Sequence, residues 1–341
     1  MQFKEDLKSF KVLSIDGGGI KGLYAARILN SFEKRLRAEH GDEIRIVDFV
    51  DMICGTSSGG LIALALSLRI PTDEICKFYI ESGSKIFKGS NGIYAKIKQI
   101  FWGSKFNDIV LKEELKSIFS DKKIKDSNCL LCIPTFDFTH GTYGIFKFDH
   151  KEGNLTRHNQ LLMTDVALST SAAPTYFPLA EIKEEFSTQY IDGGIWANNP
   201  SLIGFLEALR YFVGDTKEYN HLNLLSIASL NNLNGQRPLK ERERSFLQWI
   251  PDIFELSLVG QSEFANIFLS MIKDLKNIPL TYTRIPGASI SPKQSEEIKL
   301  DLASTKSLVL IQQLANHVFY SIKDNADVYD FFSSKKSYFV N

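Results

Sequence analysis

The sequence of 341 residues predicts an α/β fold in which helices flank a mostly parallel central sheet. Three observations support this prediction. Short apolar runs alternate with longer amphipathic stretches, which is typical of strands alternating with helices. Two of the apolar runs enter helices through glycine-rich turns, at residues 16–22 and 55–60. The hydrophobic content of 44% is enough for a sizeable core, so we expect a single domain over residues 1–341.

The first predicted strand, at residues 12–15, runs into the sequence DGGGIKG at residues 16–22. Apolar residues then recur with the 3.6-residue period of an amphipathic helix, at Leu23, Ala26, Leu29, Phe32 and Leu36. The glycines therefore lie at a helix N-terminus, where unpaired N–H groups and the helix dipole attract negative charge. We predict that this loop binds an anion and forms an oxyanion hole.

The same loop has two alternative interpretations. Gly17, Gly19 and Gly22 also satisfy the dinucleotide-binding pattern G-x-G-x-x-G. That pattern requires an acidic residue at the end of the second strand about 20 residues further on. Here the next strand runs through Asp48 and Asp51 into another glycine turn instead. We favour the oxyanion hole, and a dinucleotide loop and a purely structural turn remain as alternatives.

The second turn has the sequence GTSSGG at residues 55–60, between the apolar runs 49–54 and 61–68. It matches the nucleophile elbow G-x-S-x-G, in which small flanking residues leave a serine hydroxyl exposed at the apex of a sharp strand-to-helix turn. Gly55 and Gly59 are the flanking glycines, and Ser57 is the candidate nucleophile. An ordinary glycine turn is the alternative interpretation of this motif taken alone.

The third turn supplies a candidate base. A short apolar run ends at Asp192, which Gly193 and Gly194 follow. A serine hydroxyl is a poor nucleophile until a neighbouring base accepts its proton, and an aspartate held at a strand end can accept it. A lone Asp-Gly-Gly is usually only a turn. Together with the elbow and the anion-binding loop, it predicts a hydrolase site.

These motifs, with the sequence STSAAPTYFP at residues 169–178, resemble in order and spacing the patatin-like phospholipases. The resemblance covers about residues 11–230. It implies a patatin-like hydrolase fold and a Ser-Asp dyad without histidine, in which Ser57 is the nucleophile and Asp192 the base. It also implies that the amides of Gly17, Gly18 and Gly19 form the oxyanion hole. The substrate class it implies is membrane phospholipid, cleaved as by a phospholipase A through an acyl-enzyme, with no cofactor.

Lys21 and Gly22 are expected to support the glycine loop. For Lys21, a contact with a lipid phosphate and an exposed side chain without a role are the alternatives.

A Ser-Asp-His catalytic triad would require a histidine close to Ser57 and Asp192. Only His221 and His317 follow Asp192 in the Ser, Asp, His order of ordinary α/β hydrolases, and neither lies in a motif. His221 precedes the apolar run at residues 222–228, where a strand-edge or loop histidine is the simpler interpretation. We therefore expect a dyad, and the triad remains the alternative.

Charge excludes one class of partner and indicates another. The 40 basic and 40 acidic residues give no electrostatic signature for duplex nucleic acid. Residues 82–107 contain no acidic residue and alternate lysines with aromatic residues, which suits a membrane interface. The expected membrane contacts are Lys96, Lys98, Phe101 and Trp102, with a solvated face as the alternative.

A second amphipathic stretch, at residues 246–272, is typical of a core helix. There are two alternatives: the stretch forms a contact between copies of the chain in a homo-oligomer, or it forms a lipid-facing surface.

The N-terminus lacks the pattern of a signal peptide, and no apolar stretch is long enough to span a membrane. We expect a cytoplasmic protein that associates peripherally with the inner face of the membrane when active. The four cysteines are scattered, and Cys129 and Cys132 lie in a strand-like run where positions three apart face opposite sides. We therefore expect no metal site and no redox role.

From about residue 240 to 341 we expect a helical C-terminal extension, which contains the sequences RIP at 284–286, IKLDLAS at 298–304 and YDFF at 329–332. With the compact length and the glycine loop near the N-terminus, the chain is similar to the bacterial patatin-like effectors of CBASS antiphage systems. This similarity implies activation by a cyclic di- or trinucleotide, with no residue assigned to its binding. The alternatives are an unregulated or partner-regulated lipid acyl hydrolase and a nucleotide-sensing module without turnover.

Overall fold

The computed structural model describes residues 8–87, 104–230, 243, 245–275 and 277–340. An eight-stranded sheet of order β5-β6-β3-β2-β1-β7-β8 forms its centre, and β4 pairs with β3 outside this path. The strands are β1 (Ser9–Ile15), β2 (Met52–Gly55), β3 (Leu130–Asp137), β4 (Thr142–Lys147), β5 (Ala180–Ile182), β6 (Thr188–Asp192), β7 (His221–Ile227) and β8 (Leu280–Ile285). The α/β fold with a sheet flanked by helices is confirmed.

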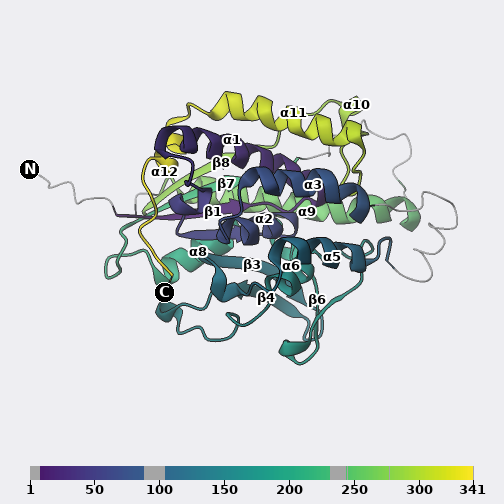
Figure 1. Ribbon diagram of the computed structural model, residues 1–341, viewed down its shortest axis with the longest axis horizontal. Helices are drawn as coiled ribbons and strands as arrows, with labels where there is room; N and C mark the ends of the chain where they lie inside the picture. Colours follow the sequence, from purple (N-terminus) through teal and green to yellow (C-terminus); the bar gives the residue numbers. More distant parts are fainter. Residues whose placement is uncertain (1–7, 88–103, 231–242, 244, 276, 341) are drawn as a thin grey trace, which may run out of the picture.

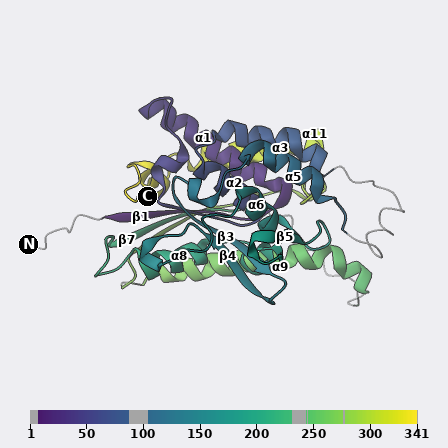
Figure 2. The same cartoon turned by 60° about the horizontal axis from the view of Figure 1, so that its bottom comes forward.

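The helices lie on both faces of this sheet (Figures 1 and 2). They are α1 (Gly22–His40), α2 (Ser58–Ser67), α3 (Thr72–Ile86), α5 (Asp108–Phe119), α6 (Met163–Ser171), α7 (Gly194–Ala197), α8 (Ser201–Tyr211), α9 (Phe246–Ile272), α10 (Pro292–Ser295), α11 (Thr305–Ile322) and α12 (Ala326–Phe332). Figure 2 shows α1, α3 and α11 on one face, and α8 and α9 on the other.

The sheet is parallel in the part that carries the predicted turns. Strands β3, β2, β1, β7 and β8 pair in parallel, whereas β4 and β6 are antiparallel to β3, and β5 is antiparallel to β6. The carboxyl ends of the parallel strands therefore meet at one edge, which is where α/β sheets bind ligands. The register also aligns Cys54 with Cys132, and Thr135 with Asp192. Thr135 lies three residues beyond Cys132, and Ser57 lies three residues beyond Cys54, so Ser57 and Thr135 are at the same height along the strands. Since Asp192 pairs with Thr135, Ser57 and Asp192 lie at the same end of the sheet.

The C-terminal third differs from the helical extension that the sequence predicts. It contains α9, α11 and α12, but also β8, which pairs in parallel with β7 over six residues from Leu222↔Leu280 to Ile227↔Ile285. Alternating burial of Leu280 and Tyr282 fits a strand with one face packed on the core. Further along, the tail is held by Asp51, whose Oδ1 accepts the N–H groups of Ser337 and Tyr338 at 3.0 and 2.8 Å.

Helix α9 has the predicted bounds, but its orientation differs from that of a core helix. Several of its apolar side chains are exposed: Ile253, Leu256, Phe264, Ile267, Phe268 and Met271. The buried side of the helix consists of Leu258, Ser262, Ala265 and Leu269, so a core contact is present at these positions. Beside them, a strip of polar residues that includes Glu255, Glu263 and Asn266 lines a cavity next to β7 and β8. The core interpretation is therefore wrong for these exposed positions. No helix among the described residues is long and apolar enough to cross a membrane.

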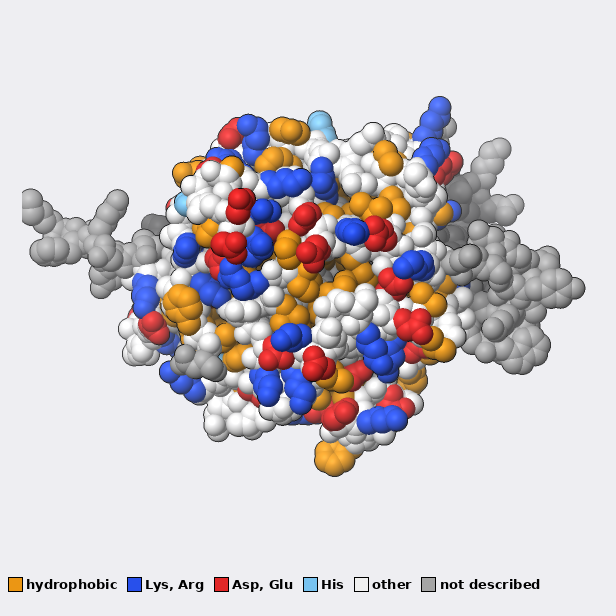
Figure 3. Space-filling model, viewed as in Figure 1, with side chains coloured by type: hydrophobic (Ala, Val, Ile, Leu, Met, Phe, Trp, Pro, Cys, Tyr) orange, Lys and Arg blue, Asp and Glu red, His pale blue; other side chains and the backbone are white. Residues whose placement is uncertain are grey.

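The surface agrees with the zero net charge. On the face drawn in Figure 3, acidic and basic side chains are interspersed, with no large area of one sign. The predicted membrane contacts Lys96, Lys98, Phe101 and Trp102 lie outside the described residues.

Candidate active site

Ser57 lies at the apex of a strained turn between β2 and α2. Its φ of 53° is in the left-handed region that non-glycine residues rarely adopt. A Cβ on Gly55 would lie 2.2 Å from the carbonyl oxygen of Gly59, and a Cβ on Gly59 would lie 2.3 Å from that of Ile15. Both flanking positions therefore require glycine, and this close approach brings the start of α2 against the ends of β1 and β2.

The Ser57 hydroxyl donates a hydrogen bond of 2.6 Å to Oδ2 of Asp192, the last residue of β6. The other carboxylate oxygen accepts the N–H of Gly194 at 2.7 Å, so both oxygens have donors. Asp192 is buried, and burial raises its pKa from 3.8 to about 6. At neutral pH the carboxylate is mostly ionised, yet it is a stronger base than an exposed aspartate.

The glycine loop faces this pair with free amide groups. Among the described residues, the N–H groups of Gly18 and Gly19 have no acceptor, whereas that of Gly17 donates to the Asn198 carbonyl at 3.0 Å. The sequence assigns all three glycines to an oxyanion hole, but the structure leaves only Gly18 and Gly19 as free donors. Gly19 has a φ of +57°, and a Cβ there would lie 2.3 Å from the Leu300 carbonyl oxygen.

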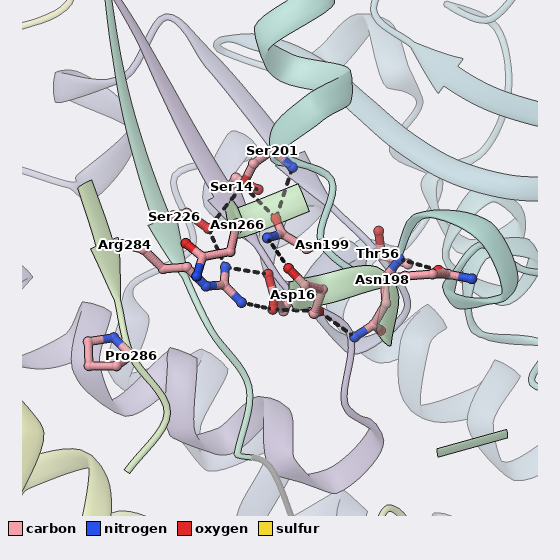
Figure 4. Close-up of polar contacts among 12 residues, drawn as sticks. Ser14, Asp16, Thr56, Asn198, Asn199, Ser201, Ser226, Asn266, Arg284 and Pro286 are labelled. Atoms are coloured by element: carbon pink, nitrogen blue, oxygen red, sulfur yellow. Dashed lines mark hydrogen bonds and ion pairs between the residues drawn. The ribbon is translucent and has the colours of Figure 1, made fainter. Parts of the chain in front are cut away.

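A buried ion pair holds the start of the loop (Figure 4). Asp16 accepts from Nη1 and Nη2 of Arg284 at 3.2 and 2.6 Å, and from the Ser262 hydroxyl at 3.0 Å. Arg284, in β8, also donates to Oγ of Ser226 at 2.6 Å. The sequence offers no signal for this contact beyond the unassigned RIP at residues 284–286, because Asp16 and Arg284 are far apart along the chain.

Lys21 is buried and forms an ion pair of 3.1 Å with Glu255 of α9. The alternative that it is an exposed lysine without a role is therefore wrong. Gly22 is required by packing, since a Cβ there would lie 2.7 Å from the Tyr79 hydroxyl and 2.8 Å from Cβ of Ser58.

Ser57 and Asp192 open into an apolar cavity of about 70 Å³. Its walls include Leu61, Phe78, Ile86, Leu111, Phe177 and Phe254. Such a lining suits an aliphatic chain beside the serine.

No described histidine lines this cavity. His221 begins β7, at the opposite edge of the parallel strands from Ser57, and its Nε2 lies 2.9 Å from the Thr281 hydroxyl. His317 is exposed on α11. Among the described residues there is also no cluster of His, Cys, Asp or Glu that would hold a metal ion.

A strained serine hydrogen-bonded to a buried carboxylate, next to free amides and an apolar cavity, is the arrangement of a serine hydrolase acting on an apolar acyl group. Comparison with known proteins places the chain within this class. The family described as patatin-like phospholipase matches residues 13–203, more than half of the chain. The protein belongs to the patatin-like phospholipase family and is a lipid hydrolase.

Two relatives and one solved structure illustrate the similarity. Patatin-like protein 2 of Oryza sativa subsp. indica is 35% identical over 315 residues, covering 82% of this chain and 77% of its own. A cGAMP-activated phospholipase of Pseudomonas aeruginosa is 30% identical over 312 residues, covering 91% and 88%. Human GIVD cytosolic phospholipase A2 aligns with a TM-score of 0.46 at 10% identity, over 97% of this chain and 60% of its own.

The pKa of Asp192 leads to a prediction about stability. Its folded-state pKa, about 6, lies above the unfolded value of 3.8, so ionised Asp192 destabilises the fold above pH 6 and costs nothing below pH 4. Asp192→Asn should therefore increase the unfolding free energy at pH 8 by up to about 3 kcal/mol and raise the melting temperature accordingly. Both gains should vanish toward pH 4. Calorimetry across this pH range tests it, and a gain independent of pH would contradict it.

The positions of the histidines lead to a second prediction. His221→Ala and His317→Ala should each keep ester hydrolysis within about twofold of the wild-type rate, because neither ring is at the site. The measurement is kcat/KM on a soluble ester, with circular dichroism to verify folding. A loss of about a thousandfold or more in either folded variant would instead indicate a triad.

Proposed function

We propose that the protein hydrolyses the acyl esters of membrane phospholipids through an acyl-enzyme on Ser57, with Asp192 as the general base. The hydrogen bond of 2.6 Å from Ser57 Oγ to Asp192 Oδ2 carries this proposal. It gives the serine proton a direct acceptor, so that a histidine is not needed.

The reaction proceeds in two halves. Asp192 takes the hydroxyl proton while Ser57 Oγ attacks the ester carbonyl carbon, and the Gly18 and Gly19 amides stabilise the resulting oxyanion. The intermediate collapses, the lysophospholipid leaves as an alcohol, and Asp192 returns the proton to it. A water then attacks the acyl-enzyme and gives a proton to Asp192. Release of the fatty acid restores that proton to Ser57.

Two features compensate for the weak basicity of a carboxylate. Burial raises the pKa of Asp192 to about 6, which brings its basicity closer to that of a histidine. Fixed amide donors for the oxyanion contribute about 3 kcal/mol each in other acyl-transfer enzymes. The glycine loop, fixed by the Ile20 N–H to the Leu300 carbonyl at 2.9 Å, is pre-organised to supply two.

We further propose that a cyclic di- or trinucleotide activates the enzyme, as in an antiphage effector. Support comes from the relative named a cGAMP-activated phospholipase, whose similarity covers 91% of this chain and so extends beyond the catalytic segment at residues 13–203. The alternatives are a hydrolase without a regulator, one restrained by a protein partner, and a nucleotide-sensing module without turnover.

The exposed apolar face of α9 is proposed to rest on the membrane surface during hydrolysis. Phe254 and Leu258 of the same helix line the apolar cavity at Ser57, so the exposed face is continuous with the proposed acyl site. Apolar side chains that cover nothing in the protein gain free energy by entering the acyl boundary of a bilayer.

Fatty-acid release from mixed phospholipid vesicles tests the enzyme and its activation together. We expect release to rise when one member of a panel of cyclic di- and trinucleotides is added, and Ser57→Ala to lower it about a thousandfold or more. Release that no nucleotide changes would remove the activator and keep the enzyme. Equal release by wild type and Ser57→Ala would refute Ser57 as the nucleophile.

The proposed membrane contact predicts a difference between two substrates. Phe264→Asp and Ile267→Asp should each lower vesicle hydrolysis roughly tenfold, because an apolar side chain no longer enters the lipid. Hydrolysis of a soluble short-chain ester should remain unchanged. Val309→Asp is the matched control, since Val309 is an exposed apolar residue of α11 on the opposite face of the sheet. Equal losses with both substrates would exclude the contact.

A further inference from the structure

A second cavity lies directly behind the glycine loop. Its volume is about 520 Å³, and it is bounded by α9 and by the carboxyl ends of β7 and β8. Five polar residues of α9 and Lys273, the residue just after the helix, line it: Glu255, Ser262, Glu263, Asn266, Ser270 and Lys273. This volume falls in the range of about 300–1,000 Å³ that is typical of small-molecule sites. We call it the polar cavity.

The polar cavity and the apolar cavity at Ser57 share a wall. Gly18, Asn198, Leu258 and Leu300 line both cavities. A change on one side of this wall therefore reaches the oxyanion loop and the acyl site directly.

Helix α9 also contacts both cavities within one turn. Glu255 lies in the polar cavity and pairs with Lys21 of the glycine loop, whereas the neighbouring Phe254 and Leu258 line the apolar cavity. At about 70 Å³ the apolar cavity is far below the size of a typical ligand site, and Phe254 and Leu258 of α9 form part of its wall.

We propose that the polar cavity is the activator site and binds a phosphodiester ligand of the cyclic di- or trinucleotide class, whose phosphate replaces Glu255 as the partner of Lys21. Without that ion pair, the segment of α9 around Glu255 moves away from the glycine loop and the acyl cavity opens. This inference rests on the proposed activation and gives it a site and a mechanism.

The lining matches a ligand that carries both anionic phosphates and polar bases. Lys273 has no ion-pair partner among the described residues and supplies a positive charge for a phosphate. Two buried atoms of the lining, Oγ of Ser229 and Oδ1 of Asn198, have no hydrogen-bond partner within the part of the chain that the structure describes. An unpaired buried polar atom costs free energy that a ligand group recovers. The carboxylate of Glu263 is available to base N–H donors.

Compared with the Asp16–Arg284 pair, which also lines the cavity, Lys21–Glu255 is the ion pair that a ligand exchanges at lower cost. The Glu255 side chain is 22% exposed, so its displaced carboxylate returns to water. Asp16 is only 2% exposed and would be left as an unpaired buried charge if Arg284 were taken from it. The Asp16–Arg284 pair therefore stays as a fixed support while the other pair switches.

Ligand binding is measured first, on the Ser57→Ala protein so that turnover does not interfere. Calorimetric titration uses cGAMP, cyclic di-adenylate and cyclic tri-adenylate, with glycerophosphocholine as the lipid-headgroup probe. Lys273→Glu removes a charged contact and Ser270→Trp fills the cavity, so each should weaken nucleotide binding about tenfold or more. Lys293→Glu, the same charge reversal at an exposed lysine of α10 outside the cavity, should bind as the parent does.

The ion pair is tested without any ligand. Glu255→Gln weakens the pairing with Lys21 and should raise hydrolysis of a long-chain ester about fivefold in the absence of nucleotide. Hydrolysis of a short-chain ester, which does not need an enlarged cavity, should rise less. Asp274→Asn, a carboxylate just beyond α9 that does not line the polar cavity, is the matched control. A long-chain to short-chain ratio equal to that of wild type would overturn the mechanism.

The outcomes separate this inference from the proposed function. A nucleotide that binds and activates wild type, Lys273→Glu and Ser270→Trp equally would keep the proposed activation and overturn the site. If none of the nucleotides binds or activates wild type, the proposed activation and the ligand assignment both fall. Binding of glycerophosphocholine at the affinity of the nucleotides, lost in the same variants, would make the cavity a headgroup site and overturn its role as an activator site.

Discussion

The close approach of α2 to the ends of β1 and β2 is the constraint on which the site depends. It requires glycine at 55 and 59, because a Cβ at either position would collide with backbone oxygen. The sharp turn that results leaves Ser57 with a positive φ. Strain of this kind persists only where surrounding packing over-determines the backbone. Here the Ser57 N–H is held by Oγ1 of Thr170, which itself donates to the Pro134 carbonyl. The reactive hydroxyl is thus positioned by rigid neighbours on three elements.

The C-terminal third completes the catalytic edge of the sheet. Strand β8 brings Arg284 to Asp16 at the start of the glycine loop, and α9 brings Glu255 to Lys21 at its other end. Buried ion pairs of this kind contribute little net stability, because desolvation offsets the attraction. Their effect is instead to determine the geometry of the loop that carries the free amides. Residues beyond the segment that the family match covers therefore contact both ends of the glycine loop, which is the proposed oxyanion site.

Helix α9 has one side that contacts the protein and another that is apolar and exposed. Its buried side packs Leu258, Ala265 and Leu269 on the protein next to a strip of polar residues that lines the polar cavity, whereas much of its outer face is apolar and exposed. The exposed apolar side chains of the outer face do not contribute to the core, since only apolar surface that is buried drives folding. The partner proposed for this outer face is the membrane that carries the proposed lipid substrate. The same helix lines the apolar cavity at Ser57 and pairs with Lys21, so the proposed surface contact, the proposed acyl site and the glycine loop all involve one element.

The sequence by itself determined the α/β class, the elbow at Ser57, the glycine loop and the turn at Asp192. Each of these depends on a few adjacent residues, because glycine positions dictate local backbone conformation directly. Only the tertiary structure decided which amides of the loop are free, since the N–H of Gly17 is taken by a carbonyl at residue 198. It alone decided the partners of Asp16 and Lys21, which lie 268 and 234 residues away. Such contacts have no local pattern, and the period of α9 reveals two faces without revealing which one turns inward.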